Sequence, residues 1–232
     1  MRLHISFLRN TLAVSLFLLA TLAGWGQGAT LDATTYFEGL VQYRVTYSGE
    51  VKETFDESKV NTNMDLALRN GHFIIQMYGG TVDKTLLYNA DSNWTYSIDV
   101  AEKKIYLLEK HRQRVKQQPE VTPTGDSVKV LGKWCYGYRF AKPATPKYPA
   151  STTTLYINPE YRINLAYYEG KDISQAYWSL KGLQGCIPLK IVFEDPTMRI
   201  ESTAERIRPM PLREEEFRLP PGFKILRWDQ RR

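Results

Sequence analysis

The chain has 232 residues, with 31 lysines and arginines against 25 aspartates and glutamates, so its formal net charge is +6. This mild excess is spread along the chain and gives no reason to expect a nucleic-acid partner. The length suits a single domain with a substantial core. With 15 Tyr, 9 Phe and 5 Trp, much of that core or its lining must be aromatic.

The first 28 residues have the layout of a secretory signal peptide. Arg2 and Arg9 precede the apolar run "TLAVSLFLLATLAGW", and the small residues of "GQGAT" follow. This order is typical of a cleavable signal, whereas the alternative, a membrane anchor, needs about 20 apolar residues. We predict a signal peptide at residues 1–28 and a single periplasmic domain at residues 29–232 with no transmembrane span. Cleavage removes two arginines and leaves 29 basic against 25 acidic residues, a net charge of +4.

Cys135 and Cys186 are the only cysteines of the sequence. In an exported chain two cysteines most simply form one disulfide. Closing a loop of roughly fifty residues would stabilise the fold by about 4 kcal/mol. Neither cysteine has a neighbouring metal-ligand residue and no C-x-x-C pair occurs, which disfavours a metal site or a redox pair. We predict a Cys135–Cys186 disulfide, with two buried, unpaired thiols as the alternative.

The first part of the mature chain alternates between two periods. In "YFEGLVQYRVTYSGE" apolar and polar residues alternate with a period of two, which predicts a half-buried strand. Apolar residues then recur at three- and four-residue steps and are followed by Gly71, which predicts an amphipathic helix over Val60–Asn70. After Gly71 the period returns to two through "HFIIQMY", "KTLLYNADSNWTYSID" and "KKIYLLEK".

The second half of the chain continues mostly in strands. "SVKVLGKWCYGYRFA" predicts either one bent strand or a hairpin around Gly132, and "TTTLYIN" and "RINLAYYEG" predict strands joined by a tight turn. "KDISQAYWSLKGLQG" has one apolar helical face, which predicts a second helix over Ile173–Leu180. "IPLKIVFED" and "TMRIESTAERIRP" predict a late hairpin. About ten strands and two helices indicate an α+β domain, a mainly antiparallel β-sheet with helices on one face.

No pattern in the chain predicts catalysis. The sequence has no G-x-S-x-G, no H-E-x-x-H and no phosphate-binding glycine loop. His72 has no acid paired in register, and the acids Glu214–Glu216 favour a solvated turn over a cation site. The basic run Lys110–Lys116 is interpreted as a solvated connector, with contact to lipid headgroups or a partner as the alternative. We predict no enzyme activity, no cofactor and no metal.

Aromatic alternation is the strongest functional signal. Many strands carry large side chains on both faces, although only two helices are predicted to cover the sheet. One explanation is a sheet packed on both sides. The one we favour is a curved sheet whose concave face is partly uncovered and forms an apolar cleft, because a tyrosine ring contacts an acyl chain while its hydroxyl bonds to water or backbone. The candidate lining residues are Tyr43, Val45, Phe73, Ile75, Trp94, Tyr96, Tyr138, Phe140, Tyr156 and Tyr168.

Several phrases of the sequence, in their order, resemble a known family. They are "FEGLVQYRVTY", "VLGKWCYGYRF", "TTTLYINPE", "LKGLQGCIPLKIVFED", "RIESTAERIRP" and "EEEFRLPPGFKIL". Behind a signal peptide they resemble uncharacterised exported proteins of Gram-negative envelopes related to the lipoprotein carriers LolA and LolB. The resemblance implies a strongly curved half-barrel, with the helices at Val60–Asn70 and Ile173–Leu180 covering its concave face around an apolar cavity. No functional residue of the carriers is matched position by position.

The predicted function is binding without chemistry. We expect a soluble periplasmic protein that holds a lipid acyl chain or a lipoprotein in its apolar cleft. Each methylene removed from water would contribute about 0.8 kcal/mol to binding. The alternative is an envelope assembly or protein-interaction module whose cavity is filled by its own side chains, with an envelope protein as its partner.

Overall fold

The computed structural model describes residues 36–49, 60–81, 83–108, 120–146, 148–169, 171 and 181–227. The predicted signal peptide, the basic run at Lys110–Lys116 and the predicted helix at Ile173–Leu180 lie outside the described residues. Contacts group Tyr36–Arg232 into one compact unit. In the part of the chain that is described, no helix is long and apolar enough to cross a bilayer.

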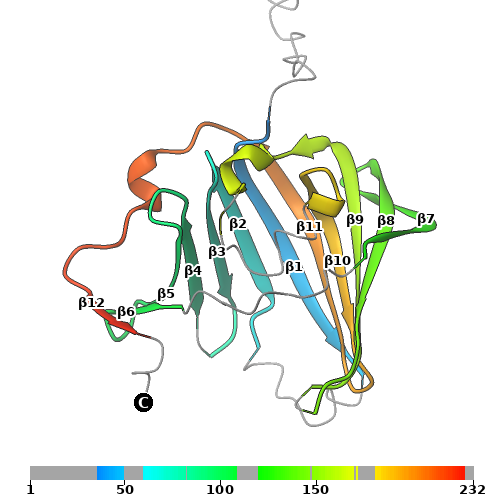
Figure 1. Cartoon of the computed structure of the whole chain (residues 1–232), viewed down its shortest axis with the longest axis horizontal. Helices are drawn as coiled ribbons and strands as arrows, with labels where there is room; N and C mark the ends of the chain where they lie inside the picture. The colour runs from blue at the N-terminus through cyan, green and yellow to red at the C-terminus, as the bar shows by residue number, and fades with distance from the viewer. Residues whose placement is uncertain are drawn as a thin grey trace, which may run out of the picture. The chain divides into compact units, whose positions relative to one another are not determined.

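One twelve-stranded sheet makes up most of the described structure (Figure 1). Its order is β12-β6-β5-β4-β3-β2-β1-β11-β10-β9-β8-β7, and β12 and β6 are its one parallel pair among the described strands. The strands are β1 (Gly39–Ser48), β2 (Asn63–Arg69), β3 (His72–Tyr78), β4 (Lys84–Asn89), β5 (Trp94–Asp99), β6 (Lys104–Leu107), β7 (Thr122–Val130), β8 (Lys133–Lys142), β9 (Ser151–Arg162), β10 (Cys186–Glu194), β11 (Arg199–Pro209) and β12 (Lys224–Arg227).

The predicted α+β half-barrel with about ten strands and two covering helices is wrong. Among the described residues, helical backbone is limited to two 3-10 turns, η2 (Leu165–Tyr168) and η3 (Glu214–Phe217), and to Lys181 and Gly182. The segment predicted as the first covering helix, Val60–Asn70, contains strand β2 instead. The described domain is therefore a β structure.

A period of two within the same segment explains the error. Met64, Leu66 and Leu68 alternate with other residues and stand opposite successive odd-numbered residues of β1, so all three lie on one face of the sheet. Asn70 and Gly71 have positive φ angles of 45° and 81° and join β2 to β3. Asn-Gly is the favoured pair for such a two-residue hairpin turn. Gly71 therefore follows a strand and not a helix.

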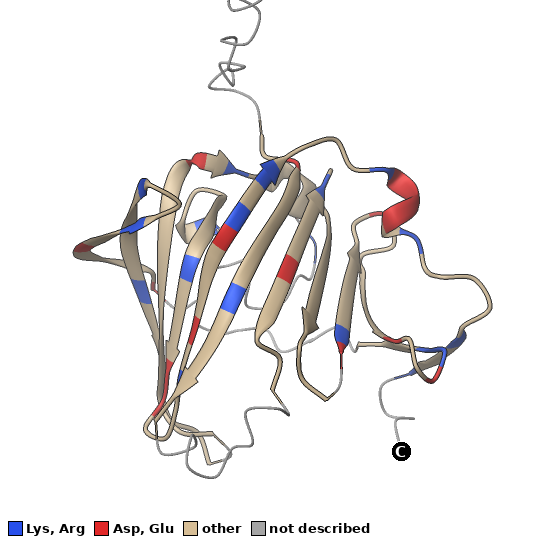
Figure 2. Ribbon diagram, turned by 180° about the vertical axis from the view of Figure 1, so that it is seen from behind, with Lys and Arg blue, Asp and Glu red and all other residues tan. Residues whose placement is uncertain are grey.

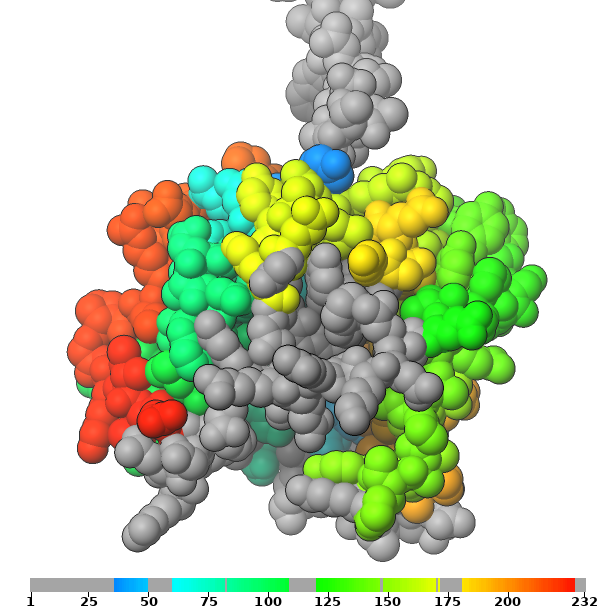
Figure 3. All heavy atoms as spheres, in the orientation of Figure 1, coloured from blue at the N-terminus to red at the C-terminus, as the bar shows by residue number. Residues whose placement is uncertain are grey.

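The sheet has two faces of different chemistry. The inner face carries Tyr43 and Phe73, and η2 lies over it in front of the strands (Figures 1 and 3). Acids and bases are interspersed along β1, β10 and β11 (Figure 2), and the pairing register places Arg44, Lys190 and Glu201 on the outer face. There Arg44 pairs with Glu205 at 3.2 Å, and the Lys190 ammonium lies 2.6 Å from a Glu201 carboxylate oxygen. Exposed pairs of this kind contribute little stability but keep this face solvated.

The chain after β11 covers the outer face of β4, β5 and β6. Phe217 of η3 is 2% exposed and packs against Leu87, Tyr96 and Ile105. The segment is tied to the sheet at Leu212, whose N–H donates to Glu38 Oε1 at 2.9 Å and whose carbonyl accepts from the Arg69 guanidinium. Each face of the sheet therefore has its own apolar core.

Replacing Gly71 with alanine should destabilise the protein by about 2 kcal/mol or more. The new Cβ would lie 2.5 Å from Tyr167 Cβ, on a backbone whose φ of +81° already disfavours a side chain. Gly132→Ala is the matched control because φ there is +78° and nothing lies within 4 Å of the added Cβ. Urea unfolding of both variants gives the comparison. Equal losses of unfolding free energy would show that the contact with Tyr167 is unimportant.

Candidate functional site

The inner face is closed where η2 covers it. Tyr43, Tyr88 and Tyr168 are 2%, 0% and 3% exposed and belong to one buried cluster. The Tyr43 hydroxyl donates to the Pro188 carbonyl at 2.8 Å, and the Tyr88 hydroxyl donates to Asn93 Oδ1 at 3.1 Å. Because their rings are packed and these two hydroxyls are bonded, this end of the face is protein core.

Burial keeps these tyrosines neutral. Desolvation raises the pKa of Tyr88 to about 12 and the pKa of Tyr43 well above its usual value. At Tyr168 desolvation again raises the pKa most, and the neighbouring Tyr88 raises it further. A neutral phenol in an apolar core is neither a nucleophile nor a base at neutral pH, so this end has a structural role.

A row of half-buried side chains crosses the other end of the inner face. The pairing registers place these residues opposite one another on β1, β11, β10, β9 and β8 in turn. With neighbouring strands about 4.8 Å apart, the row spans about 19 Å. All of its members are half-buried. We call this set the inner-face row; it consists of Tyr47, Ile200, Phe193, Thr153 and Phe140.

The next row toward η2 supports the inner-face row. It runs across the same five strands, and three of its members are buried while the other two are half-buried. Its one polar member is Ser202. Together the two rows form a mostly apolar strip on the inner face of these five strands. The members of this second row are Val45, Ser202, Ile191, Leu155 and Tyr138.

Most of the predicted cleft residues share the inner face, but they do not share one site. Phe140 belongs to the inner-face row, and Val45 and Tyr138 belong to the row beside it. The remaining inner-face residues lie toward or within the closed end, and Tyr168 reaches that end from η2. By register the predicted residues on the inner-face strands are Tyr43, Val45, Phe73, Ile75, Tyr138 and Phe140.

The other three predicted cleft residues lie on the outer face. Trp94 and Tyr96 belong to the cluster packed beneath Phe217. Tyr156 follows the inner-facing Leu155 and therefore points outward; its hydroxyl donates to Asp126 Oδ2 at 2.8 Å. These three residues therefore do not line the inner face. The alternation along a strand separates its residues into two sets, but it does not say which set faces which side of the sheet.

Sequence reasoning missed four members of the inner-face row. Tyr47, Phe193 and Ile200 each continue an alternation with a residue of the second row, and that alternation is visible in the sequence. The sequence does not show which strands are neighbours in the sheet: β1 lies next to β11, more than 150 positions away along the chain. Thr153 carries no apolar signal of its own.

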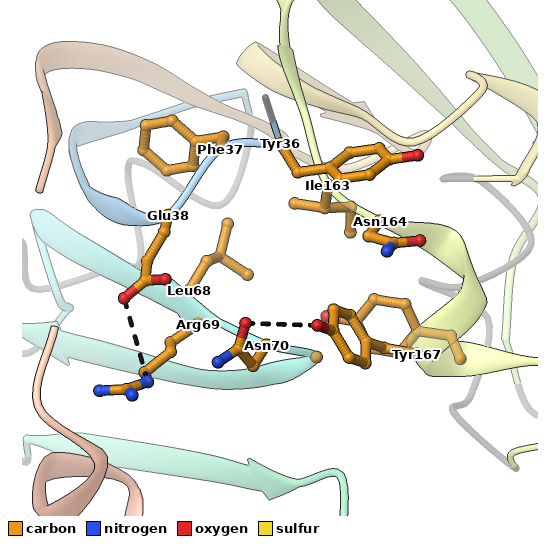
Figure 4. Close-up of a pocket in the computed structure, with 11 residues that line it drawn as sticks. Tyr36, Phe37, Glu38, Leu68, Arg69, Asn70, Ile163, Asn164 and Tyr167 are labelled. Atoms are coloured by element: carbon orange, nitrogen blue, oxygen red, sulfur yellow. Dashed lines mark hydrogen bonds and ion pairs between the residues drawn. The ribbon is translucent and has the colours of Figure 1, made fainter. Parts of the chain in front are cut away.

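A small cavity lies between the start of β1, the β2–β3 turn and η2 (Figure 4). Its volume is about 100 Å³, below the roughly 300 Å³ at which sites for drug-sized ligands begin. Its polar groups are bonded to one another: Glu38 Oε1 lies 4.0 Å from Arg69 Nε, and the Tyr167 hydroxyl donates to Asn70 Oδ1 at 3.4 Å. This cavity is too small for a lipid chain.

A second, wide-open hollow of about 530 Å³ lies at the ends of β8, β9 and β10. Its lining includes Ala141, Thr152 and Glu194. The lining also includes Lys142 and Ser151, so the hollow lies around the strand ends and not on one face of the sheet. No member of the inner-face row lines it, and it therefore lies outside the candidate site.

Cys135 and Cys186 are both buried and both free. They lie on β8 and β10, which flank β9 on opposite sides. Two strand spacings, about 9.6 Å, therefore separate them, whereas bridged cysteines have Cα atoms within about 7 Å. The predicted disulfide is not formed, and the alternative of two buried thiols describes the structure. Burial raises the pKa of both thiols, although Arg162 opposes the rise at Cys186.

The titratable groups considered in the sequence have structural contacts. His72 Nδ1 accepts from the Ala90 N–H at 3.2 Å, and its ring centroid lies 5.9 Å from that of Phe217. On η3, Glu214 pairs with Arg218 at 2.8 Å and Glu216 pairs with Arg213. Within the described ranges no group of three or more His, Cys, Asp or Glu side chains is placed to hold a metal ion.

No protein-family model and no curated protein matches the chain. Among solved structures, an uncharacterized conserved protein from Thermus thermophilus is similar, with 11% sequence identity and a TM-score of 0.46. The match covers 80% of this chain and 90% of that one. A likeness this weak carries no argument about fold or function, so the resemblance to lipoprotein carriers stays a prediction.

Two free thiols per chain should react with a thiol reagent in denaturant without any reductant. In the native protein the same reaction should be slow, because both sulfurs are buried and the raised pKa keeps them protonated. Absorbance of the released chromophore measures both states. Fewer than two reactive thiols after unfolding, restored to two by a reductant, would show that the cysteines are bonded.

Stability should fall as the pH rises from about 10 to about 12. In this window the unfolded tyrosines lose protons while the buried ones keep theirs, so the unfolded state binds fewer protons and is favoured by each rise in pH. Urea unfolding at several pH values measures the slope, and Tyr88→Phe should make it shallower. A flat profile through the window would contradict the burial of these hydroxyls.

Proposed function

We propose that the protein is an exported, soluble periplasmic protein that binds a lipid acyl chain, free or on a lipoprotein, along the inner-face row without catalysis. The single observation that supports this is the row itself: half-buried residues, four of the five with large apolar side chains, aligned across five strands for about 19 Å. A linear apolar ligand fits this shape better than a compact one, because only a linear ligand contacts all five strands at once.

The energetics require close coverage of the bound chain. About 15 methylenes at ~0.8 kcal/mol each give about 12 kcal/mol when fully buried and about half of that when one side stays wet. Association costs at least about 4 kcal/mol. Full burial then supports roughly micromolar binding, whereas a chain lying on the surface with one side exposed would bind barely at all.

The residues of the row support binding and offer little for chemistry. The Tyr47 hydroxyl donates to the Asn61 carbonyl at 3.0 Å, and desolvation raises its pKa. Ile200, Phe193 and Phe140 contribute only apolar surface. Thr153 carries the other hydroxyl of the row. No member of the row has a charged side chain.

The closed end of the inner face favours a second candidate. Tyr43, Tyr88 and Tyr168 are buried at that end, as they would be in an envelope assembly module that presents its outer surface to a protein partner. Such a module would need no bound lipid. The two functions therefore differ in a directly measurable property.

Protein purified from its native envelope should carry lipid. Organic extraction followed by mass spectrometry should find about one acyl chain per protein, and the delipidated protein should take up a fluorescent fatty acid with saturation. Protein that is empty on extraction and also fails to take up the probe would support the assembly module instead.

Phe193→Ser should weaken fatty-acid binding by about tenfold or more, because it removes a large apolar surface from the middle of the row. Ile98→Ser is the matched control: Ile98 is also half-buried, but it belongs to the outer-face cluster beneath Phe217. Both variants should lose some stability, so binding is compared at a temperature where both are folded. Equal weakening by the two changes would place the ligand elsewhere.

A further inference from the structure

Strand β8 carries an aromatic stripe that runs from the inner face to an exposed end. Trp134, Tyr136, Tyr138 and Phe140 are spaced two apart, but at the hairpin end Cys135, which alternates with them, packs in the inner-face cluster, so the strand has twisted between its two ends. Phe140 and Tyr138 are half-buried, whereas Tyr136 and Trp134 are 52% and 56% exposed. Trp134 and Tyr136 therefore lie on the surface of the β7–β8 hairpin, on the side opposite Cys135, which packs in the inner-face cluster.

The hairpin end adds a cation and another apolar side chain to the stripe. Lys129 of β7 stands opposite Trp134, with its ammonium 5.6 Å from the centre of the ring. Leu131, in the turn, is 41% exposed. We call Lys129, Leu131, Trp134 and Tyr136 the hairpin tip. It presents two aromatic rings, one aliphatic side chain and one ammonium group together.

The hairpin tip belongs to a hairpin that is anchored in the core. On the other face of the same two strands Val130 is 4% exposed and Cys135 is 0% exposed, and both belong to the main buried cluster. β7 is also the last strand in the sheet order, and Figure 3 shows the green atoms of this hairpin at the margin of the molecule. The aromatic rings are thus held at an accessible edge by a packed base.

The charge of the hairpin favours an anionic partner. Between Thr122 and Lys142 there are four basic residues and one acid, a net charge of +3 (4 − 1), which is half of the +6 of the whole chain. Lys133 is balanced by Glu160, with which it forms an ion pair. Lys129 instead contacts the exposed ring of Trp134. The basic residues of the hairpin are Lys129, Lys133, Arg139 and Lys142.

We propose that the hairpin tip docks the protein onto the surface of an anionic phospholipid bilayer. Tryptophan and tyrosine favour the interface between headgroups and acyl chains, because one part of each ring system is apolar and the other is polar. A lysine beside them can extend its ammonium to the lipid phosphates while its stem stays on apolar surface. This docking goes beyond acyl-chain binding and does not require it.

Sedimentation with vesicles tests the docking. The purified protein should bind vesicles of phosphatidylcholine mixed with phosphatidylglycerol, bind pure phosphatidylcholine vesicles more weakly, and be released by salt, because the charge term is screened. Trp134→Ser/Tyr136→Ser should lower the partition coefficient by about tenfold or more. Lys129→Gln should lower it by about fivefold on the anionic vesicles alone. Tyr148→Ser, which changes a tyrosine that is 62% exposed in the loop after β8, should leave it unchanged.

Two outcomes would overturn the docking proposal. One is equal partitioning of the wild type and Trp134→Ser/Tyr136→Ser when their urea unfolding curves coincide. The other is no binding to anionic vesicles, including the case in which the hairpin tip captures an envelope protein instead. Fatty-acid titration of the same variant separates this proposal from the preceding one: unchanged fatty-acid affinity together with lost vesicle binding supports docking as an independent property.

Discussion

The pairing register of β1 with β2 and β11 is the constraint on which the rest of the structure depends. Because side chains alternate across a strand, a slip of one residue would move Tyr43, Val45 and Tyr47 to the outer face and bring Arg44 to the inner face. The alternation of buried and exposed residues along β1 makes that slip costly. Both the closed core beneath η2 and the inner-face row follow from this one register.

The inner face thus divides into a buried end, which stabilises the fold, and a half-buried end, whose apolar side chains could contact a ligand. Toward η2, buried tyrosines with bonded hydroxyls and raised pKa values form a core. At the opposite end, the residues of the inner-face row are only half-buried, and the hairpin tip of β7 and β8 is a separate exposed aromatic surface. The proposed binding site is the part of the inner face whose apolar side chains are not fully buried by the protein, since exposed apolar surface commonly marks a site of interaction with a partner or ligand.

Local pattern in the sequence predicted much of the strand content but not the arrangement. The strict alternation around Tyr43 and Val45 gave the first strand correctly, and the hairpin around Gly132 was one of two predicted possibilities. The apolar residues of Val60–Asn70 also fit a period near 3.6, which predicts a helix, whereas Asn70–Gly71 is the pair favoured in two-residue hairpin turns and indicates the strand that the structure has. The outward positions of Trp94 and Tyr156 depend on which face is covered. Whether Cys135 and Cys186 can form a disulfide depends on the order of the strands in the sheet. Neither the covered face nor the strand order can be read from a local stretch of sequence.

Photolabelling with a fatty acid that carries a diazirine near its chain end tests the central claim most directly. Mass spectrometry of the digested protein should find the label on the inner-face row, in peptides from β8, β9, β10 and β11 that contain Phe140, Thr153, Phe193 or Ile200, and excess unlabelled fatty acid should suppress it. Label confined to the outer-face cluster around Phe217, or label that excess fatty acid does not suppress, would contradict the account.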